Sequence, residues 1–174
     1  MADLVGNVSE IQYGYRIVNG EIQILENNNA ADPLADLSKD SPEWRAILPD
    51  SSDEGYTLVD PGTSGTLHWN GSQLGTEVPQ DTIQSKIIKF TAITTSSALT
   101  KIPCIMYELG LIPIKLNYGP DETDGYCSLA MLGEEMLSSR GGHYTSEDYA
   151  GLGSVSTASR NSADVRRGCR PRSL

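Results

Sequence analysis

The stretch YRIVNGEIQI, residues 15–24, constrains the fold of this chain more than any other feature. Asn-Gly is the preferred pair for a two-residue type I′ turn, because both central residues need a positive φ. A turn at Asn19-Gly20 pairs Ile17 with Ile22, and side chains then alternate between two faces of a β-hairpin. The apolar face consists of Tyr13, Tyr15, Ile17, Ile22 and Ile24. An isolated two-stranded hairpin is marginally stable, so this face must pack against something.

A second Asn-Gly pair, Asn70-Gly71, predicts a second hairpin in which Trp69 lies opposite Ser72. Further strands are predicted at residues 56–59, 82–95 and 102–118. Two hairpins in one small chain indicate an antiparallel sheet, because each hairpin pairs consecutive strands in opposite directions.

Residues 124–139 form the principal helix that the sequence predicts. Acidic residues precede it and stabilise the positive end of a helix, and a glycine pair follows it as a stop signal. Leu129, Leu132 and Met136 repeat at helical spacing, so we expect them to face the core.

These elements predict an α+β fold: a single β-rich domain of mainly antiparallel hairpins with one principal helix near 124–139. The domain covers residues 1–142 and includes a polar segment at 26–40 that we expect to be flexible. Residues 143–174 lack hydrophobic periodicity and contain many serines and arginines. They predict a mostly disordered C-terminal tail that is basic at its end.

The charge of the chain is unevenly distributed. The formal net charge is −10, but residues 157–174 carry +4, which leaves −14 on the rest. The acidic part should repel nucleic acid and anionic lipid, whereas the tail is expected to make weak contact with RNA or anionic lipid. A solvated end without a ligand is the alternative. The arginines of the tail are Arg160, Arg166, Arg167, Arg170 and Arg172.

Cysteine usage and hydropathy bear on the location of the protein. Cys104, Cys127 and Cys169 are well separated and include no CxxC pair, which argues against a disulfide framework and a cysteine-based zinc site. The first ten residues do not resemble a signal peptide. The richest apolar run is short and interrupted by charges and prolines, so we expect no transmembrane segment. We expect a cytoplasmic protein, or one of the host cytoplasm or virion if viral, that is not secreted.

The sequence carries no motif for catalysis, cofactor binding or metal binding. Neither a phosphate-binding glycine loop nor a nucleophile elbow is present. The two histidines, His68 and His143, are separated along the chain, and His68 is expected on the solvent side of its strand. We therefore expect a protein that is not an enzyme and that has no cofactor, metal or catalytic residue. A pocket that holds either histidine beside a carboxylate would indicate otherwise.

The leading interpretation is a non-enzymatic self-assembly or interaction protein. Within that class the composition favours a small viral structural protein, matrix-like or capsid-associated, that forms homo-oligomers and contacts other structural proteins. The alternatives are a cellular or phage-encoded peptide- or protein-binding module and an enzyme with an unrecognised site. The apolar face of the first hairpin is the candidate self-association surface, unless it packs within its own domain.

Overall fold

The computed structural model describes residues 8–79, 87–112, 126–128, 135–143, 145–146, 151–161 and 167–168. The strands are β1 (Ser9–Val18), β2 (Glu21–Leu25), β3 (Trp44–Pro49), β4 (Tyr56–Val59), β5 (His68–Trp69), β6 (Gln73–Gly75), β7 (Ile88–Lys89), β8 (Thr94–Thr95), β9 (Tyr126–Ser128), β10 (Glu135–Gly141), β11 (Gly151–Ser159) and β12 (Arg167–Gly168). The helices are the α-helix α1 (Ile105–Glu108) and two 3-10 helices, η1 (Glu26–Ala31) and η2 (Phe90–Ala92).

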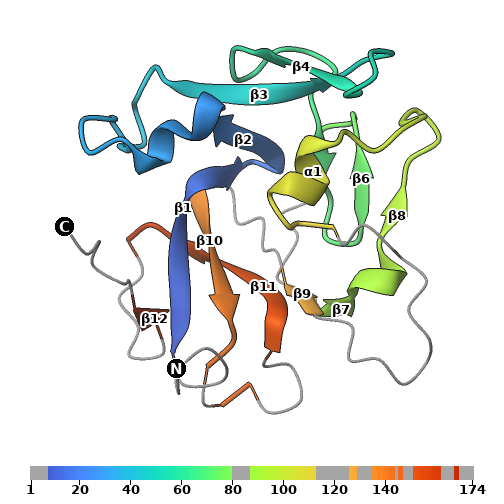
Figure 1. The fold of residues 1–174 in the computed structure, drawn as a ribbon. Coiled ribbons are helices and arrows are strands. Elements are labelled where there is room, and N and C mark those ends of the chain that lie inside the picture. The colour runs from blue at the N-terminus through green and yellow to red at the C-terminus, as the bar shows by residue number, and fades with distance from the viewer. Residues whose placement is uncertain are drawn as a thin grey trace.

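Within the described residues the strands form one twelve-stranded sheet (Figure 1). Its central path runs β7-β9-β11-β10-β1-β2-β5-β6-β8, while β12 joins β1, β3 joins β2 and β4 joins β3. The described part of the chain is therefore mostly β-sheet with one short α-helix, which agrees broadly with the predicted β-rich fold. No helix in the described part of the chain combines the length and apolar character needed to cross a membrane.

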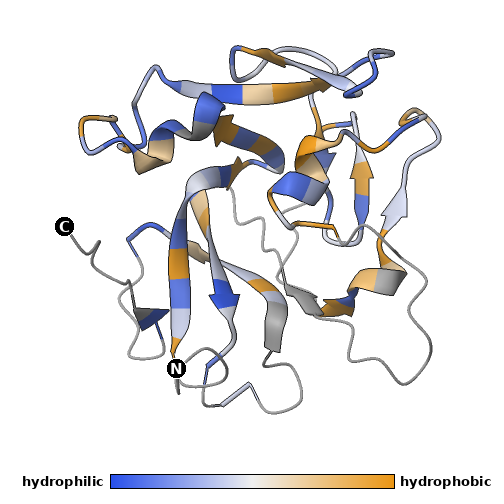
Figure 2. Ribbon diagram, viewed as in Figure 1, coloured by the Kyte–Doolittle hydropathy of each residue, from blue (hydrophilic) through white to orange (hydrophobic). Residues whose placement is uncertain are grey.

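The predicted first hairpin is confirmed. Ile17 pairs with Ile22 across β1 and β2, and Asn19 and Gly20 have φ angles of 49° and 85°, as a type I′ turn requires. Figure 2 shows hydrophobic and hydrophilic residues alternating along β1, which is the pattern of a strand with two distinct faces.

The second hairpin forms, but its predicted register is wrong. Trp69 pairs with Leu74, so the central residues of the turn are Gly71 and Ser72. Gly71 has a φ of 94°, which suits the first central position of a type II′ turn. The reason for the shift is that the Oδ1 atom of Asn70 accepts a hydrogen bond from the backbone amide of Gln73 at 2.9 Å, so Asn70 flanks the turn.

The prediction of a helix at 124–139 is wrong. Residues 126–128 form β9 and residues 135–141 form β10, which lies between β1 and β11. Met136 is buried, as expected, but it pairs with Ile17 on one side and Ser159 on the other. Leu129 and Leu132 lie outside the described residues. Pairing with the neighbouring strand β11 and with β1, which is distant in sequence, outweighs the local helical spacing.

The prediction of a disordered tail does not hold for its described residues. β11 pairs antiparallel with β10 along most of its length, and β12 pairs parallel with Ser9 and Glu10 of β1. The sheet therefore continues beyond residue 142. The prediction of strands at 102–118 is likewise wrong at residues 105–108, which form α1.

One hydrophobic core lies between the β1–β2 hairpin and the segments that follow it. Ile17 and Ile22 have no exposed surface, and Trp69, Leu74 and Met106 pack into the same cluster. Trp44 is also buried, on the opposite face of the hairpin, where Arg16 stacks on its ring. Both faces of the first hairpin are therefore covered.

Candidate binding site

An irregularity in β1 shapes the candidate site. Gln12 pairs with Ser138 and Arg16 with Leu137, so three residues of β1 are accommodated between two consecutive residues of β10. The central one is Gly14, whose φ of 142° favours glycine. A bulge of this kind bends a strand and redirects its side chains. Here it directs Tyr13 and Tyr15 toward an open pocket.

The pocket has a volume of about 720 Å³ and is formed by the bulge, the end of β2, η1, β4 and α1. In Figure 1, β2 lies at the upper end of β1, and α1 lies to the right of β1. The polar lining residues are the tyrosines, two carboxylates and two amides. The residues are Gln12, Tyr13, Tyr15, Glu26, Asn27, Tyr56 and Glu108. Ile24, Leu25, Leu58, Ile105 and Leu109 form the apolar part of the lining.

The phenol of Tyr56 lies in a partly buried part of the lining, near the carboxylates of Glu108 and Glu54. Partial burial raises the pKa of the Tyr56 phenol, and the charges of Glu108 and Glu54 raise it further. Both effects disfavour ionisation of the Tyr56 phenol, because a phenolate would carry a negative charge near those carboxylates. The described lining thus combines the phenols of three tyrosines with the carboxylates of Glu26 and Glu108.

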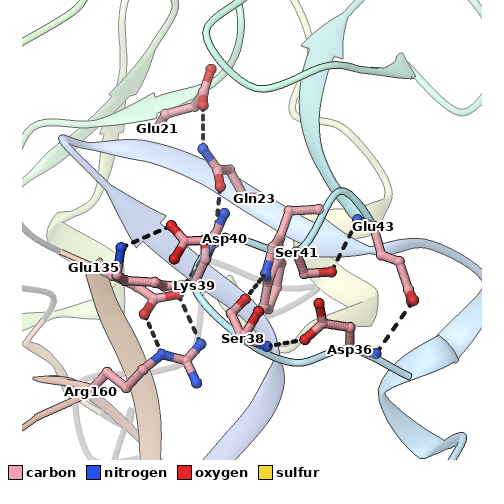
Figure 3. Close-up of polar contacts among 12 residues, drawn as sticks. Glu21, Gln23, Asp36, Ser38, Lys39, Asp40, Ser41, Glu43, Glu135 and Arg160 are labelled. Atoms are coloured by element: carbon pink, nitrogen blue, oxygen red, sulfur yellow. Dashed lines mark hydrogen bonds and ion pairs between the residues drawn. The ribbon is translucent and has the colours of Figure 1, made fainter. Parts of the chain in front are cut away.

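A second group of polar residues lies on the opposite face of the hairpin. The carboxylate of Glu135 accepts a hydrogen bond from Arg16 Nη1 at 2.7 Å and two hydrogen bonds from Arg160. Figure 3 shows Arg160 directed at Glu135. Burial would raise the pKa of Glu135, but the hydrogen bonds and charges of the two arginines outweigh it, so the pKa lies below its usual value.

The same group continues through Gln23, which lies between Arg16 and Glu21. Arg16 Nε donates to Gln23 Oε1 at 2.8 Å, and Gln23 Nε2 donates to Glu21 at 2.5 Å, the second contact being visible in Figure 3. Glu21 also accepts hydrogen bonds from the hydroxyl of Thr66 at 2.7 Å and the backbone amide of Gly62 at 3.0 Å. These buried polar groups have their hydrogen-bonding partners, which is typical of a structural network.

The histidines lie away from the pocket. His68 is buried, contrary to the prediction of a solvent-facing side chain, and its Nδ1 donates to the carbonyl oxygen of Thr66 at 2.8 Å. It is buried because β5 pairs with β2 at Glu21, inside the sheet. His143 Nδ1 accepts a hydrogen bond from Thr145. Neither histidine belongs to the described lining of the pocket.

The predicted self-association residues fall into two groups. Four of them, Tyr15, Ile17, Ile22 and Ile24, are 3% exposed or less and belong to the hydrophobic core. Tyr13 is 45% exposed and lines the pocket. The burial favours the alternative in which the apolar face of the hairpin packs within its own domain.

The described tail arginines take part in the fold. Arg160 is held by Glu135, and Arg167 belongs to β12 beside Ser9. Arg166, Arg170 and Arg172 lie outside the described residues. The pocket, by contrast, is a site that sequence reasoning missed. Gly14 within a strand pattern was the available signal, because an isolated glycine in a strand often marks a bulge.

Comparison with models of known protein families gives no match, and comparison with curated proteins gives none either. The described residues contain no group of three histidine, cysteine, aspartate or glutamate side chains that could hold a metal ion.

Proposed function

We propose that this chain is a non-enzymatic interaction protein whose binding site is the pocket beside the β1 bulge. The observation that carries the proposal is an open pocket of about 720 Å³ lined by tyrosine, amide and aliphatic side chains. Tyrosine contributes a large, rigid contact area at little entropic cost, and it is enriched where proteins bind one another. The open shape suits a polypeptide segment of a partner.

Self-assembly remains the leading form of this proposal. In that form the protein is a small viral structural protein, matrix-like or capsid-associated, and a second copy or another structural protein supplies the segment. It would act in the host cytoplasm or in the virion. The alternative is a cellular or phage-encoded peptide-binding module that acts as a monomer on a foreign partner.

An enzyme is a weaker proposal, because the described lining does not pair a histidine with a carboxylate. The lining nevertheless offers tyrosines and glutamates that could exchange protons in principle. The absence of catalytic activity therefore stays a prediction.

Light scattering on the full-length protein, from micromolar to millimolar concentration, tests the proposal. Self-assembly predicts that the mean mass rises with concentration and that Tyr13→Ala, which removes an aromatic ring from the pocket, suppresses the rise. Leu34→Ala is the matched control, because Leu34 is 89% exposed and does not line the pocket. A monomer at all concentrations favours the peptide-binding module. Association that Tyr13→Ala and Leu34→Ala leave equally intact would contradict the proposed site.

A further inference from the structure

We propose that the pocket binds an arginine side chain carried by an extended segment of a partner polypeptide. The inference rests on the function proposed above, since it names the chemistry of the segment that this pocket takes. Three features of the described residues support it: the charge of the lining, the tyrosine rings and a strand edge next to the pocket.

The charge of the lining selects a cation. Glu26 and Glu108 contribute two carboxylates, and no arginine or lysine belongs to the described lining. Arg140 lies at the margin, but its Nε donates to Gln12 Oε1 at 2.8 Å and its Nη2 donates to the carbonyl oxygens of Leu109 and Gly110. Its hydrogen bonds are thus directed at the protein. Glu26 is half-buried and Glu108 is exposed, so an incoming cation would meet one partly desolvated carboxylate, where charges attract more strongly than in water, and one that faces solvent.

The aromatic residues favour arginine over lysine. A guanidinium is planar, stacks on aromatic rings and donates in pairs to a carboxylate, whereas an ammonium is a strongly hydrated point charge. Tyr13, which is 45% exposed, and Tyr56, which is partly buried, offer rings beside the carboxylates. Burial is the main reason that the pKa of Tyr56 is raised, and the nearby charges of Glu108 and Glu54 raise it further.

The edge of β1 offers a place for the backbone of the segment. Glu10 pairs with β10 on one edge and with β12 on the other, and Arg16 pairs with β10 on one edge and with β2 on the other. Between β12 and β2, no described strand pairs with residues 11–14 on this second edge. An extended peptide can add to such an edge through main-chain hydrogen bonds while side-chain pockets read its sequence. Gln12 and Tyr13, on this edge, also line the pocket.

The same charges disfavour other classes of ligand. RNA and anionic lipid present phosphates, which the carboxylates of Glu26 and Glu108 repel. A polypeptide with an exposed arginine is therefore the partner that fits the site. In a self-assembling protein Arg170 and Arg172 of a second copy, which follow β12 in the sequence, have this chemistry.

Fluorescence anisotropy with the full-length protein tests the inference. The probe is a labelled peptide of sequence RRGSRPR, which corresponds to residues 166–172 with serine in place of Cys169. Its partner probe carries citrulline at every arginine, which keeps the shape of the side chain and removes its charge. We expect the arginine peptide to bind about tenfold or more tightly than the citrulline peptide, since a charged hydrogen bond is worth about that factor. Added salt should weaken the binding.

Substitutions locate the binding. Glu108→Gln and Glu26→Gln should each weaken the arginine peptide several-fold and leave the citrulline peptide unchanged. Glu77→Gln is the matched control, because Glu77 is exposed and does not line the pocket. Equal affinity for both peptides, no binding of the arginine peptide, or equal loss in Glu77→Gln and Glu108→Gln would each overturn the inference. If Tyr13→Ala still suppressed self-association in such a case, the proposed function would stand and the arginine specificity alone would fail.

Discussion

Arg160 holds Glu135 through two hydrogen bonds, one of them at 2.9 Å between Nη2 and Oε1, at the point where β11 ends and β10 begins. The sequence pattern predicts a helix at Glu135 and a disordered tail at Arg160. In the structure the pair links the end of β11 to the start of β10, and Arg16 of β1 forms a second ion pair with Glu135. The contact therefore ties three strands of the sheet together.

Replacing Glu135 should destabilise the fold. Glu135→Gln leaves Arg16 and Arg160 facing each other without a counter-charge, which is costly because the side chains of Glu135 and Arg16 are 10% and 8% exposed. We expect a loss of about 2–3 kcal/mol in the free energy of unfolding, measured by urea denaturation. Asp60→Asn is the control: Asp60 pairs with Arg45, but its side chain is 86% exposed, so its loss should not be measurable. Equal effects of the two substitutions would contradict the structural role of Glu135.

The carboxylate of Glu135 should make the free energy of unfolding depend on pH. The pKa of Glu135 lies below its ordinary value of 4.5 in the folded protein, so the folded state binds fewer protons than the unfolded state. Its stabilising effect is complete at neutral pH, and it is lost as the pH falls below 4.5 toward the folded-state pKa. Unfolding free energies measured between neutral pH and pH 3 should therefore fall less steeply in Glu135→Gln than in the natural protein. Parallel slopes would show that the group does not contribute.

Substitution of Gly20 should destabilise the fold more than substitution of Asn19 does. Its φ of 85° lies in a region that L-residues rarely adopt, so Gly20→Ala should cost about 1–2 kcal/mol. Asn19→Gly is the control, because glycine also accepts the positive φ of that position. Thermal unfolding distinguishes the two, and a Gly20→Ala variant as stable as Asn19→Gly would contradict the type I′ turn.

The apolar face of the hairpin should serve stability. Ile17 is fully buried, so Ile17→Ala should cost about 2–5 kcal/mol. Tyr13→Ala, on the pocket, should cost far less, because Tyr13 is 45% exposed. Chemical denaturation compares the two variants. If Ile17→Ala changed the oligomeric state and left the unfolding free energy unchanged, the face would be an assembly surface, as the other interpretation of the sequence holds.

The arginines of the tail should have two different roles, one in stability and one in ligand binding. Arg160→Gln should lower stability, because it breaks the pair with Glu135. If the tail contacts RNA or anionic lipid, replacing Arg166, Arg170 and Arg172 together with glutamine should abolish salt-sensitive binding and leave the melting temperature unchanged. Electrophoretic mobility shifts with RNA and sedimentation with anionic vesicles measure it. Failure of the full-length protein to bind either at low salt would remove the RNA and lipid prediction.

Local chemistry determined the parts of the fold that could be read from the sequence. The Asn19-Gly20 turn and the strand at Tyr56–Val59 occur as predicted, because a turn that needs positive φ and a short β-branched or aromatic run act over a few residues. Gly14 within the β1 pattern carried the signal for the bulge, although only the pairing with β10 made it part of a pocket.

Strand pairing and packing in the tertiary structure decided the parts of the fold that the sequence pattern did not predict. Met136 continues the helical spacing of Leu129 and Leu132, yet residues 135–141 form a strand between β11 and β1, and β1 comes from the other end of the chain. Arg16 and Gln23 alternate with the apolar residues as a solvent face would, but the chain around Trp44 covers them and Glu135 supplies a counter-charge from 119 residues away. A polar side chain can be buried only where such partners converge. Their convergence depends on the whole fold, so it cannot be predicted from a short stretch of sequence.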